Sequence, residues 1–303
     1  MVKEQTERVR IDEVTPSQLY LSSDRLKRLE GKEQDLEPLP IKHIGDRLFF
    51  TDGHHRAFTL FKKGREEIEV YEDEDDLDWF KYLICVDWCE KEGIESVNGL
   101  EERIVSEEDF KELWIERCQD MHKRVEEDMF EYVHIKEEKD VGRKGDICES
   151  VIRSLPDWFG IEQANLDYIE GVKDKFFLSV SVGGIPIGFV SIKEHNEYTS
   201  EVYVLGIVEE LHGRGLGRRL FEKVENILSE KGKKFLTVKT LSDSHTDEHY
   251  EGTRVFYRSI GFYPLEVFED YWDEDNPCLL MVKVLGDGSR TRRTFRESGE
   301  EEL

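Results

Sequence analysis

The chain has 303 residues, 37% of them charged, and a formal net charge of −26 at pH 7. This excess of carboxylates excludes a general nucleic-acid binder, because phosphate contacts need clustered Lys and Arg side chains. Small basic ligands such as amines would instead be attracted. Hydrophobic residues make up 38% of the chain, enough for the cores of about two domains.

The sequence carries no sign of a membrane or of a secretory context. No apolar run is long enough to span a bilayer, and residues 1–10 contain no apolar signal core. The five cysteines lack paired CxxC spacing, which favours buried free thiols over disulfides or a metal site. We therefore expect a cytoplasmic protein that has no membrane partner and no metal ion.

The first quarter of the chain has the pattern of a small α/β unit. Strands are expected at 9–14, 40–44, 47–51 and 67–71, and helices around Leu26 and Leu29 and through Phe58, Leu60 and Phe61. The second of these helices follows the sequence DGHHR, which consists of Asp52, Gly53, His54, His55 and Arg56. A glycine-opened backbone with donors at a helix N-terminus is a candidate phosphate site.

This layout resembles the ParB/sulfiredoxin fold, and DGHHR is most similar to the ParB-like free serine kinases of archaea. The resemblance implies that residues 52–56 hold the phosphates of a nucleotide. The kinase's catalytic glutamate has no counterpart, because the matching segment, residues 16–18, contains no carboxylate. A purely structural domain therefore stays open as the alternative to a nucleotide-binding one.

Two helices are expected between this unit and the second half. Residues 77–88 are apolar nearly all round, and Ser106 begins a second helix with one apolar face. We place a domain boundary in the charged segment 125–128. The predicted domains are then 1–128 and 129–286, with residues 287–303 as a disordered tail.

The second half alternates strands and helices, as a mixed α/β domain does. Strands are expected at 132–137, 176–182, 185–192, 199–208, 234–241 and 279–285, and helices at 144–154 and from Leu216 to a stop at Gly232. The strand that ends at Val208 leads into the glycine loop HGRGLG, and the helix follows directly. Unpaired N–H groups at a helix N-terminus attract anions, although a tight structural turn is the competing interpretation.

From Val172 onward the chain resembles the GNAT superfamily of acyl-CoA-dependent N-acetyltransferases. HGRGLG matches the pyrophosphate motif Gln/Arg-x-x-Gly-x-Gly/Ala at all but its first position, where His212 stands. A second family element, FYxxxGF, is matched by residues 256–262. The resemblance implies a twisted mixed sheet flanked by helices, with its fourth and fifth strands splayed apart around the pantetheine of acetyl-CoA.

The resemblance also implies the cofactor contacts. The backbone of Leu205, Gly206 and Ile207 would face the pantetheine and thioester, with a bulge at Gly206. The pyrophosphate would lie against His212, Gly213, Arg214, Gly215, Leu216, Gly217 and Arg218.

Two residues match the family's acid–base positions. Glu201, at the general-base spacing before the loop, would accept the amine proton, with Glu197 and Glu209 as rivals. Tyr257 would protonate the leaving thiolate. An exposed strand carboxylate and a core tyrosine are the alternatives. The pair His245 and His249 lies in a stretch that we interpret as a loop beside the acceptor, without a third metal ligand.

The leading hypothesis is an acetyl-CoA-dependent N-acetyltransferase that modifies a small amine or a peptide and has an N-terminal nucleotide-binding or regulatory domain. A second hypothesis is a nucleotide-binding or phosphotransfer protein that works through residues 52–56, with an accessory acetyltransferase domain. A ParB-like DNA-associated protein disagrees with the acidic charge balance.

Overall fold

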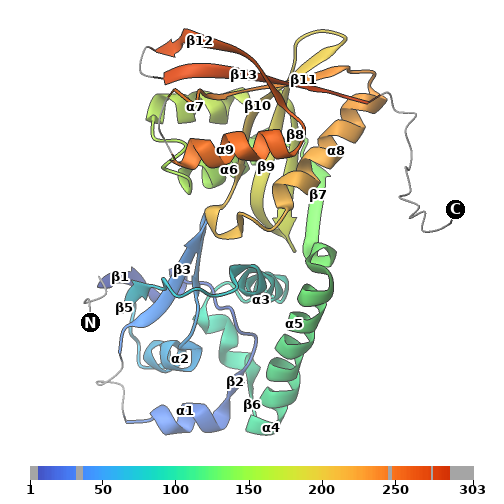
Figure 1. The fold of residues 1–303 in the computed structure, drawn as a ribbon. Helices are drawn as coiled ribbons and strands as arrows, with labels where there is room; N and C mark the ends of the chain where they lie inside the picture. Colours follow the sequence, from blue (N-terminus) through green and yellow to red (C-terminus); the bar gives the residue numbers. More distant parts are fainter. Residues whose placement is uncertain (1–5, 32–36, 245–247, 274–275, 287–303) are drawn as a thin grey trace, which may run out of the picture.

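The computed structural model describes residues 6–31, 37–244, 248–273 and 276–286. Two α/β bodies lie one above the other, and a long helix along one side connects them (Figure 1). The predicted mixed α/β class is confirmed. Among the described residues, no helix combines the length and the apolar character needed to cross a membrane.

The N-terminal body is built on a small, mostly antiparallel sheet. Its strands are β1 (Thr6–Arg10), β3 (Leu39–Ile44), β4 (Arg47–Phe50) and β5 (Glu67–Glu72). They are ordered β1-β5-β3-β4, and only the pair β3 and β5 is parallel. Helices α1 (Ser23–Leu29) and α2 (His54–Lys62) pack beside this sheet, while β2 (Leu21–Ser22) pairs with β6 (Ile104–Val105).

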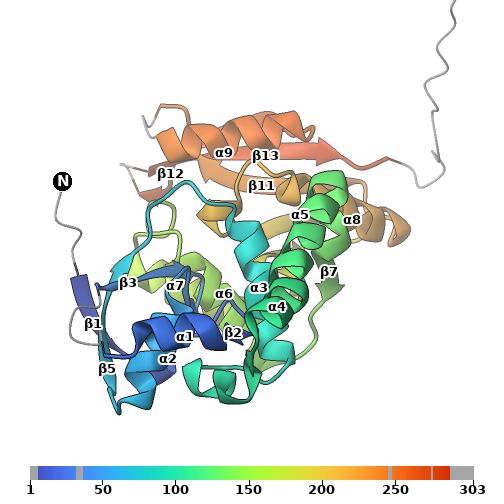
Figure 2. The same cartoon turned by 90° about the horizontal axis from the view of Figure 1, so that it is seen from below.

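A helical segment follows and leads into the second body. It contains α3 (Trp79–Lys91), the 3-10 turn η2 (Val97–Arg103), α4 (Glu107–Phe110), a π-helical stretch η3 (Lys111–Glu116), α5 (Arg117–Asp128) and the 3-10 turn η4 (Met129–Tyr132). Ser106 caps α4 by accepting a hydrogen bond from the Asp109 N–H. Helix α3 is buried over most of its surface and lies between the two bodies (Figure 1), beside α5 (Figure 2).

The second body contains a seven-stranded sheet. Its strands are β7 (Val133–Glu137), β8 (Phe176–Val182), β9 (Ile185–Glu194), β10 (Thr199–Ile207), β11 (Phe235–Leu241), β12 (Tyr263–Asp273) and β13 (Asn276–Val284). The order is β12-β13-β11-β10-β9-β8-β7, and β10 with β11 is its single parallel pair.

Helices cover both faces of this sheet. On one face, α6 (Val141–Arg153) and α7 (Glu162–Gly171) enclose a core that includes Val151, Phe177 and Val204. On the other face, α8 (Leu216–Glu230) and α9 (Glu248–Ser259) enclose a core that includes Phe221 and Val238. The central strands β8, β9 and β10 are therefore buried on both faces.

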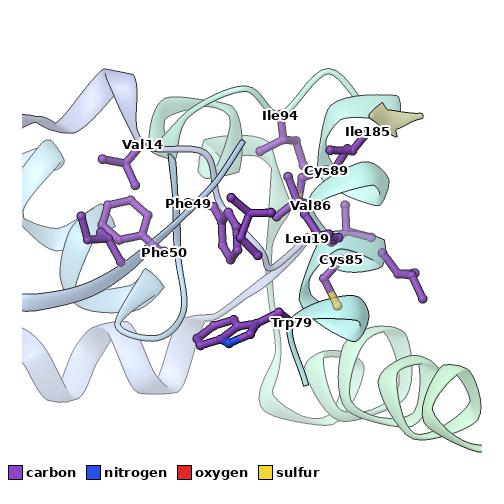
Figure 3. Close-up of a cluster of buried hydrophobic side chains, with 14 of the residues drawn as sticks. Val14, Leu19, Phe49, Phe50, Trp79, Cys85, Val86, Cys89, Ile94 and Ile185 are labelled. Atoms are coloured by element: carbon purple, nitrogen blue, oxygen red, sulfur yellow. The ribbon is translucent and has the colours of Figure 1, made fainter. Parts of the chain in front are cut away.

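A third core joins the two bodies. It combines residues of the N-terminal sheet and of α3 with side chains from the second body, namely Val180, Val182, Ile185, Ile187, Val208, Leu211 and Leu216. Figure 3 shows Ile185 beside Val86 and Cys89 of α3. Separating the two bodies would expose this apolar surface to water, so each stabilises the other.

A buried carboxylate fastens the same junction. Asp87 on α3 accepts a hydrogen bond of 2.7 Å from the N–H of Gly184, in the turn between β8 and β9. The neighbouring Gly183 has a φ of +58°, and a Cβ there would lie 2.3 Å from the Asp87 carboxylate. Lys91 pairs with the second Asp87 oxygen at 2.7 Å. The Gly-Gly turn thus serves domain contact as well as hairpin formation.

Several sequence predictions of the elements were wrong. The strand expected at 9–14 ends at Arg10, and a 3-10 turn follows it. The stretch around His249 is the start of α9 rather than a loop. Helix α7 and strand β12 were not predicted, and β12 forms one edge of the sheet. Residues 125–128 form the last turn of α5, and the domain boundary that we place there stays a prediction. His245 and the tail 287–303 lie outside the described residues.

Candidate active site

The glycine loop joins β10 to α8 through the short 3-10 turn η5 (Glu209–Leu211). Gly213 and Gly215 have φ values of +74° and +80°, in the left-handed region that side chains disfavour. Gly215 is the N-cap of α8, and no side chain caps the helix there. Around a Cβ added at Gly213 there is no atom within 4 Å, so the loop is open on that side.

The backbone amides of this loop are unused. Within the part of the chain that the structure describes, none of the N–H groups of residues 213–218 donates a recorded hydrogen bond. The next amide, that of Arg219, bonds to the Gly215 carbonyl at 3.1 Å and starts the helical pattern. We call the N–H groups of residues 213–218 the amide cradle. Successive unpaired donors at a positive helix end form a site for an anion.

Some side chains of the loop hold its backbone in place, and others are charged and exposed. His212 Nε2 donates to the Ile207 carbonyl at 2.7 Å, which ties the loop back to β10. Leu216 is buried in the shared core, and a Cβ on Gly217 would meet Phe256 at 2.9 Å. Arg218 is exposed and reaches Ser259 at the end of α9.

Arg214 is held by the other body of the protein. Its Nη2 atom lies 2.8 Å from Asp78 Oδ1, immediately before α3. Phe130 in η4 also approaches the loop, with its Cζ atom 3.7 Å from where a Gly215 Cβ would lie. The Arg219 guanidinium stands 5.2 Å from the centre of the Phe130 ring. The amide cradle therefore lies at the junction of the two bodies.

Strands β10 and β11 separate next to the loop. Their pairing runs from Thr199 opposite Phe235 to Val202 opposite Val238 and stops there. Beyond it, Leu205, Gly206 and Ile207 remain paired only with β9. The sheet thus opens between the two parallel strands on the cradle side.

The bulge in β10 lies earlier than the sequence predicted. The register with β9 shifts between Val202 and Val204, not at Gly206. Gly206 has a different role, because a Cβ there would lie 2.8 Å from the Val151 side chain on α6. The glycine permits α6 to pack closely against β10.

Glu201 lies in a buried charge cluster on β10. Its Oε2 atom is 2.7 Å from Lys239 Nζ on β11 and 2.7 Å from His195 Nε2. Burial alone would raise the pKa of Glu201, but the hydrogen bonds from Lys239 and His195 outweigh burial and hold its pKa below the usual value. The carboxylate is therefore ionised at neutral pH. Sequence reasoning missed Lys239 and His195, because no local pattern pairs them with Glu201.

Tyr257 lies on the opposite face of the sheet. Its side chain is buried in the α8–α9 core against Phe221 and Phe262. Desolvation raises the pKa of Tyr257 well above its usual range, and the phenols of Tyr250 and Tyr168 add to the shift. The phenol thus keeps its proton at neutral pH.

Aromatic residues gather above the glycine loop. The Trp158 ring lies 5.5 Å from His212 and 4.7 Å from His249, between ring centres. Trp158 Nε1 donates to Thr253 Oγ1, and Tyr250 donates to the Trp158 carbonyl at 2.8 Å. The turn after α6 and the start of α9 therefore meet beside the loop.

The loop at 52–56 uses its histidines internally. His54 Nε2 accepts a hydrogen bond from the Ser17 N–H at 3.0 Å, and His55 Nε2 accepts one from the Ser22 N–H at 2.9 Å. Both rings are consequently neutral, and burial lowers the pKa of His54 to about 3 and that of His55 to about 4.

The space around this loop is also filled. Gly53 is the left-handed N-cap of α2, with a φ of +78°. A Cβ on Gly53 would lie 2.7 Å from Leu39 and 2.9 Å from the Arg56 guanidinium. Asp52 is exposed and lies 3.7 Å from Arg56. Because both histidine rings accept hydrogen bonds from the backbone and are neutral, Arg56 is the remaining cationic donor of this loop.

A cavity of about 640 Å³ lies between the two bodies, next to the start of the glycine loop. Its lining comes from the turn between β3 and β4, from α6 and from Glu210. The lining carboxylates are Asp46, Glu72, Asp146, Glu149 and Glu210. Among the described residues, no three His, Cys, Asp or Glu side chains gather in a way that could hold a metal ion.

Comparison with known proteins assigns the second body. Residues 146–262 match the model of the acetyltransferase (GNAT) family. No curated protein sequence matches the chain. The matched segment contains β10, the amide cradle and α8, and it ends at the final phenylalanine of the FYRSIGF sequence. Residues 146–262 therefore form a GNAT acetyltransferase domain, and enzymes of this family take their acetyl group from acetyl-CoA.

Solved structures with similar folds cover about half of the chain. A GNAT-family protein of Desulfovibrio desulfuricans has 16% identity and a TM-score of 0.45, covering 51% of this chain and 99% of its own. An aminoglycoside 6'-N-acetyltransferase complexed with coenzyme A has 15% identity and a TM-score of 0.42, covering 50% and 97%. Ard1 of Thermoplasma volcanium has 18% identity and a TM-score of 0.41, covering 51% and 98%.

Proposed function

We propose that this protein transfers the acetyl group of acetyl-CoA to an amine, with the cofactor's pyrophosphate held by the amide cradle and its pantetheine between β10 and β11. The observation that carries the proposal is the coincidence of unpaired amides at residues 213–218 with the separation of the two strands after Val202. A purely structural turn requires neither feature.

The proposed acid and base have the protonation states that the reaction needs. Glu201 is ionised and can accept a proton, directly or through water, while Tyr257 is protonated and can supply one to the leaving thiolate. Glu201 and Tyr257 lie on opposite faces of the sheet, so each would act from its own side of the opening between β10 and β11.

The acceptor is proposed to be a cationic amine, either a small molecule or a peptide. The chain carries a net charge of −26, and carboxylates predominate in the lining of the cavity beside the loop. Such a field raises the local concentration of protonated amines. Loss of the amine proton must then precede attack on the thioester, which is the task assigned to Glu201.

The test is thiol release from acetyl-CoA by the full chain, with polyamines, amino acids, aminoglycosides and peptides as acceptors. Gly213→Asp places a carboxylate in the cradle, and its matched control, Gly213→Asn, has the same shape and the same left-handed backbone without the charge. We expect calorimetry to show acetyl-CoA affinity at least about 100-fold weaker for the Asp variant than for the Asn variant, from charge repulsion at short range. Equal affinities would contradict the assignment of the cradle.

The roles of Glu201 and Tyr257 have a separate test. Tyr257→Phe and Glu201→Gln should each lower kcat about 100-fold, a typical loss for an acid or base, and leave acetyl-CoA affinity unchanged. Tyr263→Phe, on the 70% exposed side chain at the start of β12, is the control for removing a phenol. Wild-type turnover in both variants would remove these residues from the mechanism.

Nucleotide binding at residues 52–56 remains a prediction. Its support is now restricted to the α2 N-terminus and Arg56, because both histidines accept hydrogen bonds from the chain itself. A regulatory role for the N-terminal body has a firmer basis in its contacts with the cradle.

A further inference from the structure

The side chain of Arg214, a residue of the amide cradle, is paired with a carboxylate from outside the acetyltransferase segment. Arg214 stands between two left-handed glycines, and its Nη2 atom lies 2.8 Å from Asp78 Oδ1. The two side chains are only 29% and 34% exposed, so solvent screens the pair incompletely. Asp78 lies before α3, far from residues 146–262 in the sequence.

The Asp78 carboxylate is already paired with the guanidinium that a phosphate would otherwise contact. Arg214 contributes its own N–H to the amide cradle, so an anion bound there lies within the length of the Arg214 side chain. Asp78 would then be a second negative group on the same guanidinium, and like charges at such distances repel. Lys81, 3.5 Å from Asp78 Oδ2, offsets only part of this charge and is itself shared with Glu126.

We propose that Asp78 competes with the phosphates of acetyl-CoA for Arg214, so that the N-terminal body sets the affinity of the cofactor site. The inference rests on the proposed function for the identity of the cofactor, but the competition applies to any phosphate anion in the cradle. Linkage makes the effect reciprocal: a bound anion weakens the Asp78–Arg214 contact by the same factor by which that contact weakens binding of the anion.

A different role for Asp78 predicts the opposite change in anion affinity. If Asp78 only oriented Arg214 toward the phosphate, its removal would weaken binding. Phe130 packs beside Gly215 and supports the loop without Asp78. The ties from His212 to Ile207 and from Leu216 to the shared core do the same. The loop backbone therefore does not depend on the ion pair, and competition is the effect that we expect.

The experiment is calorimetric titration of the full chain with acetyl-CoA and, separately, with inorganic pyrophosphate. Asp78→Asn suits it, because Asp78 is the N-cap of α3 without a side-chain capping bond and Asn is an equally good N-cap. Asp76→Asn is the matched control: it removes the same charge from the same acidic run, at an exposed residue without a recorded contact to Arg214 in the described part of the chain.

We expect Asp78→Asn to bind both ligands about tenfold more tightly than wild type, and Asp76→Asn to change affinity less than twofold, as expected for a partly buried and a fully solvated charge. In an Arg214→Ala background the difference between the two variants should vanish. Weaker binding by Asp78→Asn, or equal effects of the two variants, would overturn the proposal. Unchanged far-UV circular dichroism and melting temperature verify that each variant folds.

The two ligands separate this inference from the proposed function. Tighter pyrophosphate binding by Asp78→Asn, together with no thiol release from acetyl-CoA, would support the competition and refute the acetyltransferase assignment. If the wild type releases thiol but Asp78→Asn leaves both affinities unchanged, the acetyltransferase assignment is supported and the competition is refuted. A folded wild type that binds neither ligand would refute both.

Discussion

The loops at 52–56 and 212–218 each lead into a helix through a left-handed glycine, but the two glycine loops have different surroundings. Gly53 and Gly215 are both left-handed N-caps, with φ values of +78° and +80°, and neither helix has a side-chain cap. At the first loop, Leu39 and Arg56 fill the space beside the glycine. At the second, the space at Gly213 is open.

The histidines of the two loops extend this contrast. His54 and His55 accept hydrogen bonds from distant backbone amides and so connect the start of α2 to the chain before α1. His212 instead donates to its own strand and leaves the amide cradle uncovered. The comparison teaches that a glycine turn before a helix becomes a ligand site only when the rest of the fold leaves it unoccupied.

The largest expected effect is on stability, at the filled loop. Gly53→Ala combines a left-handed alanine, about 1 to 2 kcal/mol, with overpacking against Leu39, about 1 to 3 kcal/mol. Gly213→Ala meets no atom within 4 Å and should cost only the first amount. Urea unfolding measures both. Equal losses would mean that the two loops do not differ in packing.

Nucleotide binding at residues 52–56 would make both loops ligand sites and so remove the difference between them. A nucleoside di- or triphosphate at a hundred times its dissociation constant stabilises the folded state by about 2.7 kcal/mol, which a thermal shift detects. Because such a ligand could also occupy the amide cradle, the measurement belongs in the Gly213→Asp background. If the loop at 52–56 is a phosphate site, Arg56→Ala abolishes the shift there. Without any shift in the parent, this loop is structural.

The smallest expected effect concerns pH. Because burial lowers the pKa of His54 to about 3 from an unfolded value of about 6.5, the unfolded chain takes up a proton that the folded chain refuses. The resulting stabilisation is present above pH 6.5 and is lost as the pH falls toward 3. Between pH 7 and 5.5 the loss is about 1.3 kcal/mol.

Urea unfolding at several pH values tests this effect. His54→Asn keeps an acceptor for the Ser17 amide and should flatten the pH dependence by the stated amount. His134→Asn, on an exposed residue of β7, is the matched control for the change of side chain. A wild-type slope in the His54 variant would mean that the pKa of this histidine is the same in the folded and the unfolded protein.

Part of the candidate site could be predicted from local sequence. The apolar strand, the glycines of HGRGLG and the 3.6-residue apolar spacing of α8 specify backbone geometry over a few neighbouring residues. The acetyltransferase motifs likewise lie within short segments, and the family match of residues 146–262 confirmed that domain. Helix α7 escaped prediction because it has no side-chain cap and buries little besides Asn165.

Only the tertiary structure decided which distant groups meet. Three contacts join residues that no local sequence pattern connects. They are the Arg214–Asp78 pair, the Lys239–Glu201 pair and the hydrogen bond from Gly184 to Asp87. The same holds for the shared core, in which the hairpin of the second body packs on α3. Local sequence determines backbone dihedral angles and amphipathic faces, whereas partners across the fold follow from how those faces pack together. The amide cradle could therefore be predicted from the sequence, while the residue that occupies its arginine could not.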